Sequence, residues 1–231
     1  MKAVILAGGK GTRLRPLTYS VPKPMLPYRQ RPILEHIIEL LKSHGIDEII
    51  LSIGHLGYQI RNHFGDGSRF GVKIEYVEED QPLGTAGCLN LIRDKLNERF
   101  ILFGGDNITD LDIGDFLKFH EEKGALISIA LFGFEHKVSW GIYNLNDDRS
   151  VKSFEEKPSY NYNAGTMIFC LEPRILDFIP DNTKSPGVIN ITDHIIPELI
   201  KKGEKVYGYL HKGEWIDIGK PEDLQCMNDE E

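Results

Sequence analysis

Residues 3–27 read AVILAGGKGTRLRPLTYSVPKPMLP, a short apolar run followed directly by a loop rich in glycine and basic residues. A buried strand that opens into glycines suits a phosphate chain, because glycine lets backbone N–H groups approach phosphate oxygens closely. Arg13, Arg15 and Lys23 fall within eleven positions that contain no acid. Their side chains can offset several phosphate charges. We therefore predict a phosphate-binding loop at the end of the first strand.

This loop matches neither of two common nucleotide-binding fingerprints. A dinucleotide-type GxGxxG starting at Gly9 would require glycine where Leu14 stands, and a P-loop would require Gly-Lys-Ser/Thr where Gly11 is followed by Thr12. A nicotinamide-linked dehydrogenase also requires an acid after its second strand, but residues 48–53 lead into glycine and histidine. The loop predicts phosphate binding by a different geometry.

Composition narrows the class of protein. The chain has 231 residues, 41% of them hydrophobic, which suits one large α/β domain with a substantial core. A net charge of −8 argues against a nucleic-acid partner, which would favour a basic surface. No segment resembles a signal peptide or a membrane span, so we expect a cytoplasmic protein without a membrane partner. Cys88, Cys170 and Cys226 are widely spaced, and we expect neither a disulfide nor a zinc site.

Strand and helix patterns alternate along the first 130 residues or so. Strands are predicted at 3–6, 48–53, 72–77, 100–103 and 126–132, and helices at 32–43, 58–64, 85–92 and 112–122. After about residue 138 the predicted strands are 141–145, 151–155, 165–170 and 206–210, with helices near 175–178 and 193–202. This alternation favours a doubly wound, mostly parallel, Rossmann-like α/β sheet with a smaller lobe.

The chain shows no linker rich in glycine, serine or proline, so we predict a single domain over residues 1–231. Its first half, about 1–137, carries the glycine loop, and its second half covers about 138–228. No hexapeptide series follows, so we expect no C-terminal β-helix.

Two aspartates are candidates for a metal site. Ligands of doubly wound sheets bind beyond the carboxyl ends of the strands, and Asp106 follows the apolar run 100–103. Asp217 stands between apolar residues in WIDIG, where a buried carboxylate would need a cation, a hydrogen-bond network or a metal. Mg²⁺ prefers carboxylate and phosphate oxygens, whereas the alternative role for Asp106 is to cap a helix. We predict that the two carboxylates together bind Mg²⁺.

Two further segments allow two interpretations each. Gln81–Gly87 (QPLGTAG) is either an ordinary Pro–Gly turn or a flat seat for a nucleobase, with Gln81 bonding the edge of the base. The EEKP at 155–158 is either a solvated charged loop or a pair of groups for sugar hydroxyls and an anion.

Taken in order, these segments resemble the nucleoside-diphosphate-sugar pyrophosphorylases, also called sugar-1-phosphate nucleotidyltransferases. The shared motifs are GGxGTRLxPLT…PKPMLP, LGTAG, GDN, EKP, NAG and WxDIG, and the resemblance runs from Met1 to about Leu224. It implies a glycosyltransferase-A-like fold, with the second half of the chain holding the sugar phosphate. The PLGTAG, NAG and WIDIG segments are most similar to those of mannose-1-phosphate guanylyltransferases.

The resemblance also implies roles for individual residues. It makes Arg13, Lys23 and Asp106 catalytic and Asp106 and Asp217 the ligands of Mg²⁺. Nucleotide contacts are implied for Leu6, Ala7, Gly8, Gly9, Gly11, Thr12, Arg13, Gln81, Gly84 and Thr85. Sugar-phosphate contacts are implied for Gly141, Glu156, Lys157, Asn163 and Gly165.

The implied reaction joins an NTP and a sugar 1-phosphate and releases pyrophosphate. The residues do not decide between two substrate pairs. Guanylyl transfer to mannose 1-phosphate is favoured. Uridylyl or thymidylyl transfer to glucose 1-phosphate is the alternative, because the amide of Gln81 suits the edge of a pyrimidine base. Some relatives keep the fold as non-catalytic sugar-nucleotide sensors, and this class also stays open. A homo-oligomer is compatible with the sequence but not readable from it.

Overall fold

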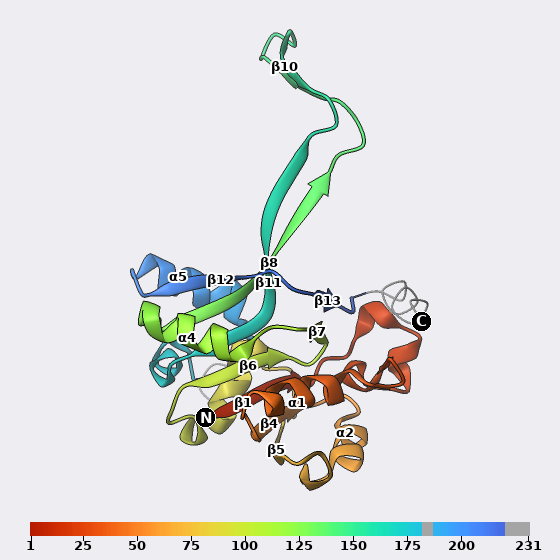
Figure 1. The fold of residues 1–231 in the computed structure, drawn as a ribbon, viewed down its shortest axis with the longest axis vertical. Helices are drawn as coiled ribbons and strands as arrows, with labels where there is room; N and C mark the ends of the chain where they lie inside the picture. The colour runs from red at the N-terminus through yellow and green to blue at the C-terminus, as the bar shows by residue number, and fades with distance from the viewer. Residues whose placement is uncertain (182–186, 220–231) are drawn as a thin grey trace.

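A seven-stranded sheet forms the centre of the molecule (Figure 1). The computed structural model describes residues 1–181 and 187–219, and the strand order is β12-β8-β11-β6-β1-β4-β5. The strands are β1 Lys2–Ala7, β4 Glu48–Ile53, β5 Lys73–Glu78, β6 Phe100–Gly104, β8 Ile127–Lys137, β11 Ser159–Leu171 and β12 Val206–His211. Four of the six pairings are parallel, and β11 runs antiparallel to both of its neighbours. The predicted mostly parallel α/β fold is confirmed.

Helices cover both faces of the sheet, because successive strand residues point to opposite sides. In β1, Ala3 and Ile5 pack into one buried cluster and Val4 into another. The first cluster lies under α1 Ile33–Ser43, α2 Gly57–Phe64 and α4 Ile113–Lys123. The second lies under α3 Gly84–Gly87, the 3₁₀ helices Cys88–Lys95 and Pro173–Phe178, the π-turn Ile191–Ile195 and α5 Ile196–Lys201.

The second helical layer is less regular than the sequence predicts. The expected helix 85–92 is a short α-helix followed by 3₁₀ turns, with a non-helical Ile92 (φ −127°). Its first turn is tied to a distant segment: Ala86 N donates to Ile189 O (2.9 Å), and Thr85 Oγ1 accepts from Ile191 N (2.9 Å). No local sequence pattern reveals these long-range bonds.

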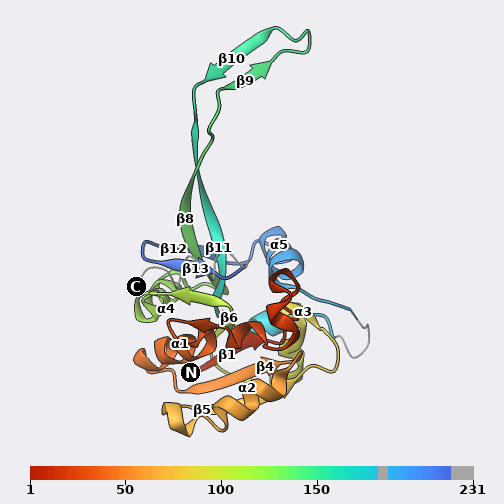
Figure 2. The ribbon, with the colours of Figure 1, turned by 90° about the vertical axis from the view of Figure 1, so that its right-hand side faces the viewer.

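A long two-stranded ribbon projects from one end of the sheet (Figures 1 and 2). β8 and β11 leave the body side by side, paired from Leu131↔Gly165 out to Lys137↔Ser159. Two short strands, β9 Ile142–Leu145 and β10 Val151–Glu155, pair at the far end. Both long strands exceed their predicted ranges, because hydrophobic patterning ends where the strands leave the core.

Most of the ribbon lies in the predicted second half of the chain, but its β8 strand, up to Lys137, belongs to the first half. β11 and β12 of the second half join the central sheet. The division into halves stays a prediction, and residues 220–228 of it lie outside the described residues. Throughout 1–181 and 187–219, no helix is both long and apolar enough to cross a bilayer.

Candidate active site

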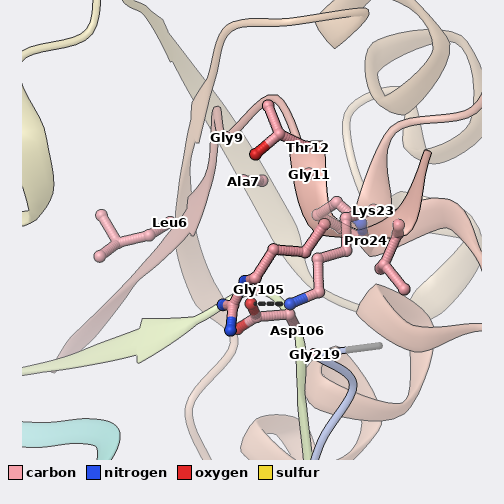
Figure 3. Close-up of a pocket in the computed structure, with 12 residues that line it drawn as sticks. Leu6, Ala7, Gly9, Gly11, Thr12, Lys23, Pro24, Gly105, Asp106 and Gly219 are labelled. Atoms are coloured by element: carbon pink, nitrogen blue, oxygen red, sulfur yellow. Dashed lines mark hydrogen bonds and ion pairs between the residues drawn. The ribbon is translucent and has the colours of Figure 1, made fainter. Parts of the chain in front are cut away.

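Two adjoining cavities open where β1 and β6 end. The smaller, of about 230 Å³, is lined by the glycine loop, Lys23 and Asp106 (Figure 3). The larger, of about 650 Å³, lies between the start of the same loop and the turn before α3. Leu6, Gly9 and Asp106 line both, so the two cavities form one continuous site.

Every nucleotide residue implied by the resemblance lines one of these cavities. Those of the smaller cavity are Leu6, Ala7, Gly9, Gly11, Thr12 and Arg13. Those of the larger are Leu6, Gly8, Gly9, Gln81, Gly84 and Thr85. Two segments separated by about 70 residues are therefore brought to one wall, since β1 and the turn before α3 both lie at the carboxyl edge of the sheet.

The shape of the glycine loop depends on Gly11. Its φ is +57°, a conformation that side chains disfavour, and a Cβ here would lie 2.8 Å from Thr18 Cγ2. Thr18 is buried, and its hydroxyl donates to Gly11 O at 2.8 Å. Because the loop turns back on Thr18, its backbone lines the cavity instead of being covered by side chains.

Lys23 lies between the two predicted metal-binding aspartates. Its ammonium forms an ion pair with Asp106, drawn in Figure 3, and stands 3.7 Å from Asp217 Oδ1. The Lys23 side chain is only 11% exposed, whereas Asp106 and Asp217 are 33% and 42% exposed. Asp217 is thus not the buried carboxylate that its apolar neighbours suggested, because 42% of its side chain is exposed.

A short strand pair brings the two aspartates together. β7 (Asn107–Thr109) pairs antiparallel with β13 (Trp215–Asp217), which places Asp217 opposite Asn107. The buried Asn107 amide donates to Asp106 Oδ1 (3.1 Å), and its carbonyl oxygen accepts from Trp215 Nε1 (2.7 Å). Asn107 therefore orients one carboxylate and anchors the strand that carries the other.

The wall of the larger cavity is held by Glu79, which sequence reasoning missed. One carboxylate oxygen accepts from Ser52 Oγ (2.7 Å), and the other accepts from Leu83 N (2.9 Å), fixing the turn that contains Gln81. Lys10, His55 and Met167 also line this cavity. The acidic run before Gln81 was the only signal for Glu79, and it equally describes a solvated loop.

The predicted sugar-phosphate residues do not line either cavity. Gly141, Glu156 and Lys157 belong to the projecting ribbon, while Asn163 and Gly165 lie where β11 leaves the body. The roles of these five residues stay predictions. Their position on or at the base of a ribbon was not predicted from the sequence.

The donor set at Asp106 and Asp217 suits Mg²⁺. No group of three or more His, Cys, Asp or Glu able to hold a metal occurs within the described ranges. Mg²⁺, however, is commonly bound through one or two carboxylates with substrate phosphates and water completing its shell. Asp106 and Asp217 supply the two carboxylates, and the neighbouring glycine loop is where the substrate phosphates would lie, so the donor set fits Mg²⁺.

The buried thiols take no part in this site. Cys88 and Cys170 are free and buried, and desolvation raises the pKa of each to about 12. Neither is therefore a thiolate nucleophile at neutral pH. Cys226 lies outside the described residues.

Comparison with known proteins identifies the family. The chain is 37% identical to the UTP–glucose-1-phosphate uridylyltransferase of Synechocystis sp. and 37% identical to the mannose-1-phosphate guanylyltransferase of Mycobacterium tuberculosis. Each match covers 96% of this chain but only 61% and 62% of the relative, so the chain spans less than two thirds of their length.

A solved structure covers almost the whole chain. HddC from Yersinia pseudotuberculosis, also solved in complex with GMP-PN, superposes with a TM-score of 0.77 over 99% of this chain and 98% of its own, at 25% identity. Residues 2–231 match the family described as "Nucleotidyl transferase". The glycine loop, the paired aspartates and this match lead to one conclusion: the chain belongs to the nucleotidyl transferase family.

Proposed function

We propose that this chain is a sugar-1-phosphate nucleotidyltransferase, which makes an NDP-sugar and pyrophosphate from an NTP and a hexose 1-phosphate. One observation carries the proposal: Lys23 stands between Asp106 and Asp217 at a glycine-lined cavity. The ammonium and the backbone amides of the loop can face phosphate oxygens, and the two carboxylates can hold a divalent cation, so together they suit a reaction between two polyanions.

In this reaction a phosphate oxygen of the sugar 1-phosphate attacks the α-phosphorus of the NTP. A new P–O bond forms in line with the bond to the β-phosphate, which breaks and releases pyrophosphate. A phosphate monoester is largely ionised at neutral pH, so no side chain has to remove a proton from the nucleophile. The inert Cys88 and Cys170 are consistent with this chemistry.

The protein's contribution is to position the phosphates and to balance their charge. Backbone amides of the glycine loop and the guanidinium of Arg13 hold the β- and γ-phosphates, which become the leaving group. Lys23 faces the α-phosphate, where charge develops. Asp106 and Asp217 would hold Mg²⁺, which when bound supplies positive charge to the phosphate oxygens.

For the substrates we propose GTP and mannose 1-phosphate. A mannose-1-phosphate guanylyltransferase among the relatives and the HddC structure with GMP-PN support a guanine nucleotide. The second candidate is glucose 1-phosphate with UTP or dTTP, which the Synechocystis relative and the amide of Gln81 in the larger cavity favour.

A pyrophosphate-release assay with Mg²⁺ tests the proposal. GTP, UTP, dTTP, CTP and ATP are each combined with mannose, glucose, N-acetylglucosamine and heptose 1-phosphates. We expect one preferred pair, with GTP and mannose 1-phosphate the fastest, and no release by the Lys23→Met variant. Folded protein that binds a sugar nucleotide but releases no pyrophosphate with any pair would identify a non-catalytic sensor instead.

A further inference from the structure

The projecting ribbon, residues 133–165, is here called the arm. Of the sixteen large apolar side chains exposed among the described residues, half lie in the arm, which makes up 33 of 231 positions. They are Phe134, Trp140, Tyr143, Leu145, Val151, Phe154, Tyr160 and Tyr162. Trp140 is 75% exposed and Tyr143 is 62% exposed. The concentration of aromatic residues is typical of a protein interface.

No residue of the arm is buried, so the arm has no core of its own. Beyond the body it consists of only two paired strands, and an isolated two-stranded ribbon is only marginally stable in water. Its rings pair along the ribbon, Phe134 with Tyr162 (5.6 Å) and Tyr143 with Phe154 (4.6 Å between centroids). Even so paired, these four residues remain 42–62% exposed, so a second surface is needed to bury them.

The arm also brings three of the five predicted sugar-phosphate residues together, apart from Asn163 and Gly165 at its base. A Cβ on Gly141 would lie 3.1 Å from Glu156 Oε2, so these two residues are neighbours across the ribbon. Lys157 follows directly, with a positive φ of 44° that marks a built turn. The carboxylate and ammonium implied for the sugar phosphate are thus assembled on the arm.

This half-site cannot reach the cavity of its own chain in the structure described. Lys157 stands two positions before β11 begins at Ser159, and Met167, farther along that strand, lines the larger cavity. The paired run from Ser159 to Gly165 alone spans roughly 20 Å at about 3.3 Å per residue, which separates Lys157 from the cavity. Between Gly165 and Ser159 the pairing with β8 is uninterrupted, so this part of the ribbon does not fold back without breaking its hydrogen bonds.

We propose that the arm docks on a second copy of this chain and completes the sugar-phosphate half of that copy's site. The inference rests on the proposed function, because the roles of Glu156 and Lys157 come with it. In a twofold dimer the exchange is reciprocal, so each cavity receives the partner's arm. The aromatic residues then bury their rings against the partner body, and Glu156 and Lys157 enter beside the nucleotide.

Complementation between two defective variants is the decisive test. Lys23→Met disables the body and leaves the arm intact, whereas Lys157→Ala disables the arm and leaves the body intact. Co-expression with two different affinity tags and sequential purification isolates the mixed dimer. With exchanged arms, one of its two sites is native, so we expect about half of the wild-type rate. If each arm serves its own chain, both sites are defective, and an inactive mixed dimer would overturn the proposal.

The mass in solution gives a test independent of activity. We expect light scattering to report twice the chain mass of 26.3 kDa for the wild type, and a single chain for Trp140→Asp/Phe154→Asp. Tyr58→Asp, which changes a similarly exposed aromatic residue on α2, is the matched control and should stay dimeric. A wild-type monomer, or a dimer unaffected by the arm changes, would exclude arm exchange.

Tryptophan emission covers the case in which the arm variants misfold. On dilution of the wild type, dissociation should expose Trp140 and shift emission to longer wavelength, whereas an arm that never docks predicts no shift. Failure of the proposed function is seen separately, as wild-type protein that releases no pyrophosphate with any substrate pair. In that case mass and emission still decide whether the arms dock.

Discussion

Asp217 lies directly opposite Asn107 in the antiparallel pair of β13 and β7, although 110 positions separate them in sequence. This pairing brings Asp217 to the same ammonium as Asp106, since Lys23 contacts both. The relative position of the two carboxylates depends on one short strand pair. A substitution in β7 that weakens this pair should therefore move Asp217 away from Asp106.

The first prediction concerns Asp217→Asn. We expect turnover with the preferred substrate pair to fall roughly 100-fold or more, because one of the two carboxylates that would hold Mg²⁺ beside the phosphates is replaced by a neutral amide. The midpoint of thermal unfolding should change little, since the side chain is 42% exposed. Steady-state rates and a melting curve check this, with Asp94→Asn, a change of an exposed acid that lines neither cavity, as the control. An unaltered rate would contradict the metal assignment.

Asn107→Leu should damage both stability and activity. It leaves Trp215 Nε1 without the acceptor now 2.7 Å away and Asp106 without the Asn107 amide donor. Losing a buried hydrogen-bond partner costs about 1–3 kcal/mol, which denaturant unfolding would detect. We also expect the Mg²⁺ concentration for half-maximal rate to rise, whereas an effect on stability alone would show that Asn107 does not position the aspartates.

His120 should make stability depend on pH below neutrality. The ring is fully buried, with Nδ1 2.9 Å from Ser128 Oγ, and desolvation, aided by Arg99, lowers the pKa of the imidazole from its ordinary value. The unfolded chain then binds the proton more tightly than the folded chain. This contribution is complete above about pH 6.5, the ordinary pKa of histidine, and declines as the pH falls toward the folded-state pKa.

Melting temperatures of wild type and His120→Gln between neutral pH and pH 5 test this sign. The slope of the wild type should exceed that of the variant, even if the variant is less stable at every pH. Parallel slopes would contradict the prediction.

The thiols of Cys88 and Cys170 should resist alkylation in the folded protein. Both are buried, and burial raises the pKa of each thiol to about 12, so the reactive thiolate is scarce at pH 8. In a Cys226→Ser variant we expect negligible native labelling by iodoacetamide and two labels per chain after denaturation. Rapid native labelling would show that these cores open readily.

Much of the fold was predictable because it depends on local patterns. The predicted strand 48–53 matches β4, and the predicted helix 112–122 lies within a residue of α4. Asp112 caps α4 by accepting from Asp115 N (2.9 Å), and Gly124 ends it with a φ of +53°. Period-two burial, caps and terminal glycines are written into neighbouring residues, so sequence alone reveals them.

The sequence by itself determined the alternating α/β core, the glycine loop with Lys23, and the two acids worth examining. Only the tertiary structure placed Asp217 beside Asp106, because β7 and β13 are too short to leave a periodic signal and meet across more than a hundred residues. Only the tertiary structure also set Glu156 and Lys157 on a projecting arm. A ribbon exposed on both faces lacks the one-sided burial that produces an alternating hydrophobic pattern. Its length and direction therefore depend on strand pairing, and in our proposal on a partner chain, rather than on local sequence.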